Sequence, residues 1–130
     1  MPSILIEVRR PYSDAEASAM IDAVHAALMD AFKTPVWDKN IRFVEHVPQR
    51  FAALPRVSDP QRYVQVTMDC FAGRSLDAKR ALYRGIVERF GSLGIPADCV
   101  QTLLRESPRE NWGIRGVPAS ELELGFNVNV

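Results

Sequence analysis

Residues 3–32, SILIEVRRPYSDAEASAMIDAVHAALMDAF, contain the pattern of a strand, a turn and an amphipathic helix in succession. Residues 3–10 alternate in apolar content and predict a strand. Ser13 is typical of a helix N-cap, and acidic residues favourable to a helix start follow it directly. Apolar residues at three- and four-residue spacing then predict an amphipathic helix over residues 14–32. A second strand is expected at residues 41–47.

The same order of elements recurs after a proline-containing connector. Residues 63–71 predict a strand, Ser75 is the expected cap of a second helix, and residues 100–106 predict a fourth strand. Equivalent serines and prolines recur at a spacing of about 60 residues, pairing Ser13 with Ser75, Pro35 with Pro96 and Pro48 with Pro108. Two βαβ units side by side predict an α/β (α+β) two-layer sandwich, in which a four-stranded sheet carries both helices on one face.

One domain is expected to span residues 1–130, because a chain of this length supports a single core. It divides into a first unit at residues 1–48, a connector at 49–61, a second unit at 62–108 and a C-terminal tail at 109–130. The sequence offers no third helix for the second face of the sheet. We therefore expect a homo-oligomer to cover that face around a symmetry axis.

The C-terminal tail has the alternating pattern of a strand. Its apolar residues stand at every second position: Leu122, Leu124, Phe126, Val128 and Val130. The pattern predicts an extended segment that pairs with the sheet edge of a neighbouring subunit.

The composition excludes several classes of protein. Hydrophobic residues make up 47% of the chain, and 16 basic residues balance 16 acidic ones, whereas nucleic-acid and anionic-membrane binding favour a basic excess. No apolar run approaches the roughly 20 residues that span a bilayer. Early charges at Glu7, Arg9 and Arg10 differ from a signal peptide. We expect a cytoplasmic protein with no nucleic-acid or membrane partner.

The cysteines and histidines show no catalytic or metal-binding spacing. Cys70 and Cys99 are too few for a disulfide framework and are interpreted as reduced structural thiols. His25 is expected on the flank of the first helix and His46 near a strand end, and neither has partners at catalytic spacing. Both are interpreted as non-catalytic, and no metal site is expected.

The second residue of the chain is a proline. Removal of Met1, which is normal before a small residue, leaves Pro2 with a free secondary amine. Model α-amino groups titrate at about 7.7–8.0, and burial lowers that pKa. Such an amine can act as a base, as an acid when protonated, or as a nucleophile toward an aldehyde. The alternatives are that Pro2 only starts a strand, or that a retained Met1 converts its amine to an amide.

Four local sequences stand in a specific order. Pro2 opens directly into a strand, FKTPVWD lies at residues 32–38, AGRS lies at residues 72–75 with Lys79 following, and NWGIRG lies at residues 111–116. Together they resemble the tautomerase superfamily, and most of all the branch of malonate semialdehyde decarboxylase and its uncharacterised bacterial relatives. The resemblance spans nearly the whole chain.

The resemblance implies a homotrimer with pockets at subunit boundaries around each Pro2, and no metal or organic cofactor. It implies action on a small keto, enol or semialdehyde carboxylate. The favoured function is keto–enol tautomerisation with Pro2 as general acid or base. The alternatives are a malonate semialdehyde decarboxylase/hydratase-like lyase, a non-catalytic trimeric binding protein, and an unrelated sandwich with an incidental proline.

Two further residues are implied to be catalytic with Pro2. Arg74 precedes the cap of the second helix, where N–H groups and the helix dipole favour an anion, and it is implied to bind the substrate carboxylate. Asp38 is implied to lie beside Pro2 and to position or activate water, and a carboxylate there raises the pKa of the amine. The alternatives are a solvated surface arginine and a turn aspartate after Pro35.

The remaining candidates concern substrate binding. Trp112 and Arg115 are expected to line the pocket, with Trp112 as an apolar wall and Arg115 as a second cation, although a structural role fits both equally. Arg42, in the second strand, is a weaker candidate for substrate binding. Ala72 departs from the decarboxylase pattern, which has a second arginine at that position, and this argues against decarboxylation.

Overall fold

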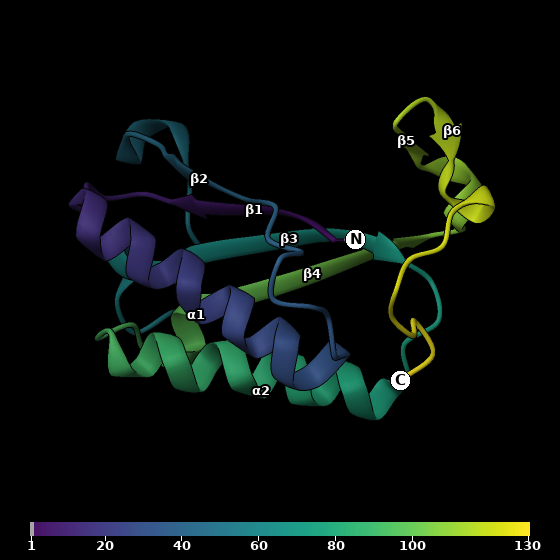
Figure 1. Cartoon of the computed structure of the whole chain (residues 1–130). Coiled ribbons are helices and arrows are strands. Elements are labelled where there is room, and N and C mark those ends of the chain that lie inside the picture. Colours follow the sequence, from purple (N-terminus) through teal and green to yellow (C-terminus); the bar gives the residue numbers. More distant parts are fainter. Residues whose placement is uncertain (1) are drawn as a thin grey trace.

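The computed structural model describes residues 2–130 and contains two βαβ units followed by a hairpin (Figure 1). The first unit comprises β1 (Ser3–Val8), α1 (Asp14–Phe32) and β2 (Ile41–Glu45). The second comprises β3 (Val64–Phe71), α2 (Leu76–Ser92) and β4 (Val100–Ser107), and the hairpin comprises β5 (Gly113–Ile114) and β6 (Val117–Pro118). Single-turn 3₁₀ helices lie in the connections, at Pro48–Arg50, Pro60–Arg62, Ala97–Cys99, Arg109–Asn111 and Ala119–Glu121.

Local capping fixes both long helices at the predicted serines. The Glu16 N–H donates to Ser13 Oγ over 3.1 Å, and the Ser13 N–H donates back to the Glu16 carboxylate over 3.0 Å. This capping box satisfies two backbone donors that the first turn leaves open. Ser75 accepts from the Ala78 N–H in the same way at the start of α2. α1 ends where Lys33 adopts a left-handed conformation with φ of 56°.

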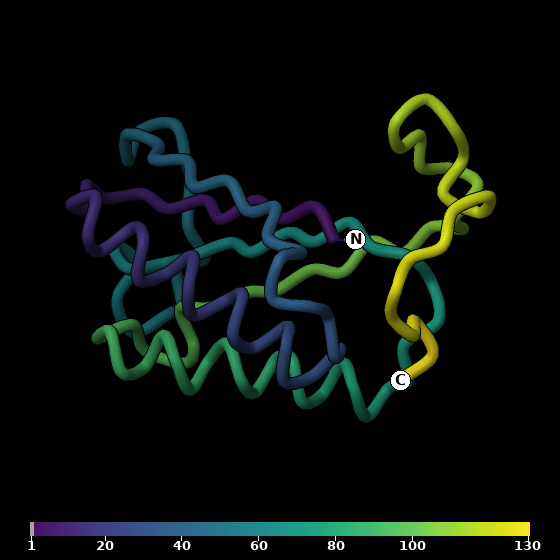
Figure 2. The backbone as a smooth tube through the Cα atoms, viewed as in Figure 1, coloured from purple at the N-terminus to yellow at the C-terminus, as the bar shows by residue number. Residues whose placement is uncertain are grey.

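The sheet has the order β2-β1-β3-β4. β1 and β3 are antiparallel at its centre, with Ile6 opposite Val66, and the two outer pairs are parallel. Figure 2 shows both helices on the same side of this sheet. The predicted two-layer α/β sandwich with two βαβ repeats is therefore confirmed.

The core lies between the sheet and the two helices. Alternate residues of β1 and β3 are buried, and they meet apolar residues that recur every three or four positions along α1 and α2. The buried side chains of α2 are Ala78, Leu82, Ile86 and Phe90, which is the set that its periodicity predicts.

The opposite face of the sheet stays open among residues 2–130. Val44 is 39% exposed and Leu103 is 47% exposed, although their neighbours Phe43 and Leu104 pack against the core. Glu7 on the same face pairs with the His46 ring, with Nε2 and Oε2 2.8 Å apart. The oligomer that the sequence predicts would cover this face.

The tail differs from its predicted strand. No strand is assigned between residues 122 and 130, because Gly125 turns the chain at a φ of 78° and Asn127 binds the backbone of Asn129. The end of the tail instead returns to its own domain, where the Ser75 N–H donates to the Val130 carbonyl over 2.7 Å. The β5–β6 hairpin projects away from the sheet (Figure 1).

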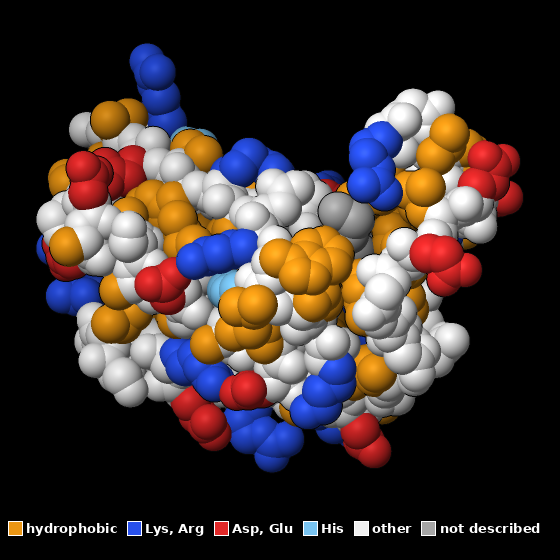
Figure 3. Space-filling view, in the orientation of Figure 1, with side chains coloured by type: hydrophobic (Ala, Val, Ile, Leu, Met, Phe, Trp, Pro, Cys, Tyr) orange, Lys and Arg blue, Asp and Glu red, His pale blue; other side chains and the backbone are white. Residues whose placement is uncertain are grey.

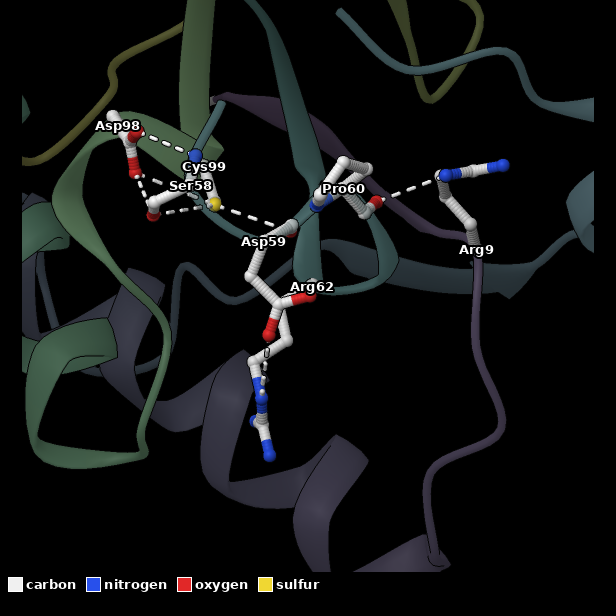
Figure 4. Close-up of polar contacts among 7 residues, drawn as sticks. All are labelled: Arg9, Ser58, Asp59, Pro60, Arg62, Asp98 and Cys99. Carbon is white, nitrogen blue, oxygen red and sulfur yellow. Dashed lines mark hydrogen bonds and ion pairs between the residues drawn. The ribbon is translucent and has the colours of Figure 1, made fainter. Parts of the chain in front are cut away.

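The connector is held by polar contacts at the end of the sheet opposite the hairpin (Figure 4). The Ser58 N–H and hydroxyl both donate to the Asp98 carboxylate over 2.7 Å. The buried thiol of Cys99 donates to the Asp59 carbonyl over 3.3 Å, and Arg9 donates to the Pro60 carbonyl over 3.0 Å. These bonds satisfy the polar groups where residues 49–61 cross from the first unit to the second.

Candidate active site

Four polar side chains are buried among the described residues: His25, Thr34, Asp38 and Arg74. Each is no more than 5% exposed. Pro2 is also buried, directly before β1, at the end of the sheet where Ser3 lies opposite Asp69. Buried polar groups normally have partners. These buried polar side chains are therefore candidates for a functional site.

The loop from residue 33 to 40 positions Asp38 against both β1 and α1. The Asp38 N–H donates to the Pro35 carbonyl over 3.0 Å and forms a turn. The Ile4 N–H donates to the Asn40 carbonyl over 3.0 Å, which ties the loop to the start of β1. Lys39 Nζ lies 2.6 Å from the Asp22 carboxylate, which ties the loop to α1.

Electrostatics connect Asp38 with the other buried groups. Burial raises the pKa of the Asp38 carboxyl above its ordinary value, while the positive amino terminus, Arg74 and His25 lower it. A buried carboxyl with cationic neighbours on several elements is characteristic of functional sites. Asp38 is therefore part of one charged cluster with Arg74 and His25.

The Arg74 guanidinium is buried with one edge unused. Nη1 donates to the Phe71 carbonyl over 3.1 Å, and Cζ lies 4.9 Å from the centre of the Phe32 ring. Nε and Nη2 are buried and have no hydrogen-bond partner among residues 2–130. Burial lowers the pKa of Arg74, and the neighbouring Cys70, Asp38 and Glu106 oppose this. Nε and Nη2 form the fork that binds a carboxylate in a bidentate manner.

Residues at the ends of β3 and β4 surround this arginine. Burial raises the pKa of the Cys70 thiol, so Cys70 stays protonated beside Arg74. Lys79 forms an ion pair with Glu106, and their hydrogen bond raises the pKa of Lys79. Lys79 is thus occupied by a carboxylate of the chain, whereas Arg74 has donors to spare.

Trp112 packs against the end of β3, next to the turn that carries Arg74. Its ring packs edge-on against Phe71 at 5.2 Å, and Nε1 donates to Ser107 Oγ over 2.9 Å. Since the Phe71 carbonyl accepts from Arg74, Trp112 supports the strand end that orients the guanidinium. The role of Trp112 as an apolar wall of the pocket stays a prediction.

Arg115 and Arg42 lie farther from the buried cluster. Arg115 turns the β5–β6 hairpin with φ of 52° and lines a groove of about 230 Å³ with Trp37 and Glu123. Figure 3 shows the surface hollowed between the domain body and the projecting hairpin. Since Trp37 precedes Asp38, the groove borders the Asp38 loop. Arg42 is exposed on the open sheet face, where Nη1 donates to Ser3 Oγ over 3.1 Å.

His25 and Thr34 were not among the residues selected from the sequence. The helix buries His25 rather than leaving it on its flank, and both His25 Nε2 and Thr34 Oγ1 are buried without a partner among the described residues. The available signal was the spacing of Ile21, His25 and Leu28 on one helix stripe. His46, by contrast, bonds to Glu7 on the far face.

Residues 2–130 contain neither a metal-binding cluster nor a helix that could cross a membrane. No group of three or more His, Cys, Asp or Glu side chains is arranged to hold a metal ion in this part of the chain. Neither α1 nor α2 combines the length and apolar character that crossing a membrane requires.

Sequence comparison defines the class of protein. A family model described as "Tautomerase enzyme" matches residues 38–115, more than half of the chain. A 2-hydroxymuconate tautomerase from Comamonas testosteroni is 41% identical over 54 residues, which cover 38% of this chain and 81% of that protein. That tautomerase is therefore about as long as one βαβ unit of this chain.

Solved structures agree with that class. FG41 malonate semialdehyde decarboxylase inhibited by 3-bromopropiolate is 25% identical, with a TM-score of 0.76 over 85% of this chain and 86% of that one. Native fused 4-OT is 21% identical, with a TM-score of 0.83 over 92% of this chain and 98% of that one, and it shows the fold alone. The fold is therefore that of a tautomerase with two βαβ units.

The chain belongs to the tautomerase family and is an enzyme. The predicted resemblance is confirmed, and the alternative of an unrelated sandwich is wrong. The matched segment contains Asp38, Arg74, Trp112 and Arg115, whereas Pro2 and all of α1 precede it.

Proposed function

We propose that this chain is a cofactor-independent keto–enol tautomerase that acts on a small carboxylate through the amine of Pro2. The observation that carries the proposal is the unused edge of Arg74, buried in one cluster with Asp38 at the end of the sheet where Pro2 begins β1.

The chemistry needs only groups that the chain supplies. Nε and Nη2 of Arg74 bind the substrate carboxylate and fix the enol beside Pro2. The amine takes the enol hydroxyl proton, and the resulting ammonium gives a proton to the carbon at the other end of the double bond. The product is the keto isomer, so the reaction consumes no co-reactant.

Asp38 sets which form of the amine rests in the site. An ionised carboxylate near Pro2 favours the ammonium form and so favours its action as an acid. Burial raises the pKa of Asp38 and opposes ionisation, while the amino terminus, Arg74 and His25 lower that pKa. A free Pro2 amine requires removal of Met1, which lies outside the described residues.

A lyase acting on malonate semialdehyde is the second candidate. The similarity to FG41 malonate semialdehyde decarboxylase and the position of Asp38 support it. In this reaction the C–C bond electrons stay on the substrate as CO₂ leaves, and protonated Pro2 supplies the proton to that carbon. Ala72 argues against it, because the chain offers no second arginine at that turn.

We also propose a homotrimer in the cytoplasm. Exposed Val44 and Leu103 on the open sheet face support an oligomer, because burial of such a face is favourable. Solved fused 4-OT structures are symmetric and asymmetric trimers. The 16 acidic and 16 basic residues leave no basic excess for an anionic membrane surface, which supports the proposed location.

The test begins with intact mass of the native protein, which reports whether Met1 has been removed. Phenylenolpyruvate ketonisation is then followed by ultraviolet absorbance for wild type and for Pro2→Ala, with Pro11→Ala in the exposed turn as the matched control. We expect a large loss only in Pro2→Ala, and labelling of Pro2 by 3-bromopropiolate. Unchanged activity in Pro2→Ala, with no label on Pro2, would refute the proposal.

Substrate choice and pH separate the two candidates. Turnover of malonate semialdehyde with CO₂ release, together with inertness toward enols, would favour the lyase. With an enol substrate, a rate that rises with pH indicates Pro2 as base, and a rate that falls indicates Pro2 as acid.

A further inference from the structure

We propose that His25 is a positioning residue of this active site, whose imidazole holds the Asp38 carboxylate in the orientation that the Pro2 chemistry requires. The inference rests on the proposed function, and it concerns a residue outside the segment that the family model matches. It starts from a buried ring nitrogen that the packing of the fold does not explain.

The His25 ring is nine-tenths buried and is not satisfied by the fold. The side chain is 5% exposed, and Nε2 is inaccessible and lacks a partner among residues 2–130. Every other buried position of α1 carries an apolar side chain. A buried ring nitrogen without a partner destabilises a fold, so a gain in function is its simplest explanation.

The contacts of the Asp38 loop bring that loop onto the same stretch of α1. Lys39, which follows Asp38, binds Asp22 over 2.6 Å, and Asp22 and His25 are three residues apart on one helix face. The bond from Ile4 N–H to the Asn40 carbonyl fixes the other end of the loop. The loop is therefore held across the turn of α1 that carries His25.

The charges in this region converge on the same carboxyl. Arg74 from the turn before α2, the positive amino terminus and His25 from α1 each lower the pKa of Asp38. In the proposed reaction Arg74 binds the substrate carboxylate and the amino-terminal amine moves the proton, so His25 is the member of this set that still lacks a role. An imidazole that donates to a carboxylate fixes both its rotamer and its ionised form.

The test compares His25→Phe, which keeps the ring shape, with His25→Gln, which keeps a donor. We expect His25→Phe to lower kcat by roughly tenfold to a hundredfold, because misplacement of a catalytic group costs rate. KM should stay within about threefold, because Arg74 still binds the carboxylate. The limb of the pH–rate profile that reports Asp38 should move to higher pH in both variants, while His25→Gln recovers most of kcat.

His46→Gln is the matched control, because His46 bonds to Glu7 on the opposite face of the sheet. It should leave kcat and the pH profile unchanged. Circular dichroism and gel filtration report folding, and if His25→Phe fails to fold, the pH profile of His25→Gln decides. Wild-type kcat and pH profile in every folded His25 variant would overturn the inference.

Labelling separates this failure from failure of the proposed function. If 3-bromopropiolate still labels Pro2 and Pro2→Ala is inactive, the proposed function stands and only the role of His25 is refuted. If wild-type protein is neither labelled nor active on enols, the proposed function fails and the inference fails with it.

Discussion

The Arg74→Lys substitution keeps a positive charge in the site and removes the planar pair of donors. The guanidinium uses Nη1 on the Phe71 carbonyl and leaves Nε and Nη2 for an anion. Each charge-assisted hydrogen bond contributes about 1.5–3 kcal/mol, and lysine replaces one of the two at most. At about 1.36 kcal/mol for each tenfold change, kcat/KM should fall by roughly 10- to 150-fold.

The Arg74→Met substitution removes both bonds to the substrate and should cost roughly 10²- to 10⁴-fold in kcat/KM. Its effect on stability should be small. Methionine still packs on Phe32, the bond to the Phe71 carbonyl is lost, and two buried donors without partners disappear. These effects oppose one another, so we expect the melting temperature to stay within about 5 °C of wild type.

The assay measures initial rates of phenylenolpyruvate ketonisation and melting temperature on the same samples. Arg80→Met is the control, because Arg80 lies exposed on α2 and pairs only with Asp77 among the described residues. Arg80→Met should leave the rate unchanged. An Arg74→Met protein that keeps its activity within threefold but melts more than about 10 °C lower would show that Arg74 is a structural residue, and would refute the reasoning.

Three further outcomes are expected. Asp38→Asn should raise the melting temperature at neutral pH, because burial raises the folded-state pKa of Asp38 and the wild type therefore loses stability as pH rises through that pKa. The advantage should disappear below about pH 4, where the carboxyl is protonated in the unfolded chain as well. The same difference in melting temperature between the two proteins at every pH would contradict this. Leu103→Glu should dissociate the proposed trimer in sedimentation equilibrium, whereas Leu93→Glu, at a similarly exposed position directly after α2, should not. An intact Leu103→Glu oligomer would place the interface elsewhere. Ser13→Ala should cost about 1 kcal/mol by thermal melting through loss of the α1 capping box, with activity unchanged, and an unchanged melting temperature would mean that the cap is redundant.

The elements whose signals are local were predictable from the sequence. The bounds of α1 agree with residues 14–32, because the Ser13 cap and the apolar period are both encoded in neighbouring residues. The tail shows the limit of such signals. Alternation at residues 122–130 indicates an extended chain with one apolar side, but a strand also needs a pairing partner, and Val128 packs beside Phe71 instead.

The residue types of the candidate site could be proposed from the sequence, whereas their burial and contacts could not. The position of Arg74 before Ser75 was visible in the sequence, but its burial depends on Phe32 and Phe71, which arrive from separate elements. The burial of His25 could not be predicted, because a single histidine on an apolar helix stripe has the same sequence pattern whether or not the Asp38 loop lies across it. The contact between Lys39 and Asp22, which shows that the Asp38 loop lies across α1, is apparent only in the three-dimensional structure.

The polar contacts of the connector in Figure 4 lie in the second unit at positions that correspond, by sequence spacing, to the Asp38 loop of the first unit. Tyr63 precedes β3 as Pro2 precedes β1, and Cys99 follows Pro96 by three residues as Asp38 follows Pro35. A polypeptide has a single amino terminus, so joining two units in one chain leaves one of two equivalent positions without an amine. At the position equivalent to the Asp38 loop, Ser58 instead bonds to Asp98 and the Cys99 thiol donates to the Asp59 carbonyl, so these contacts join the connector to the second unit.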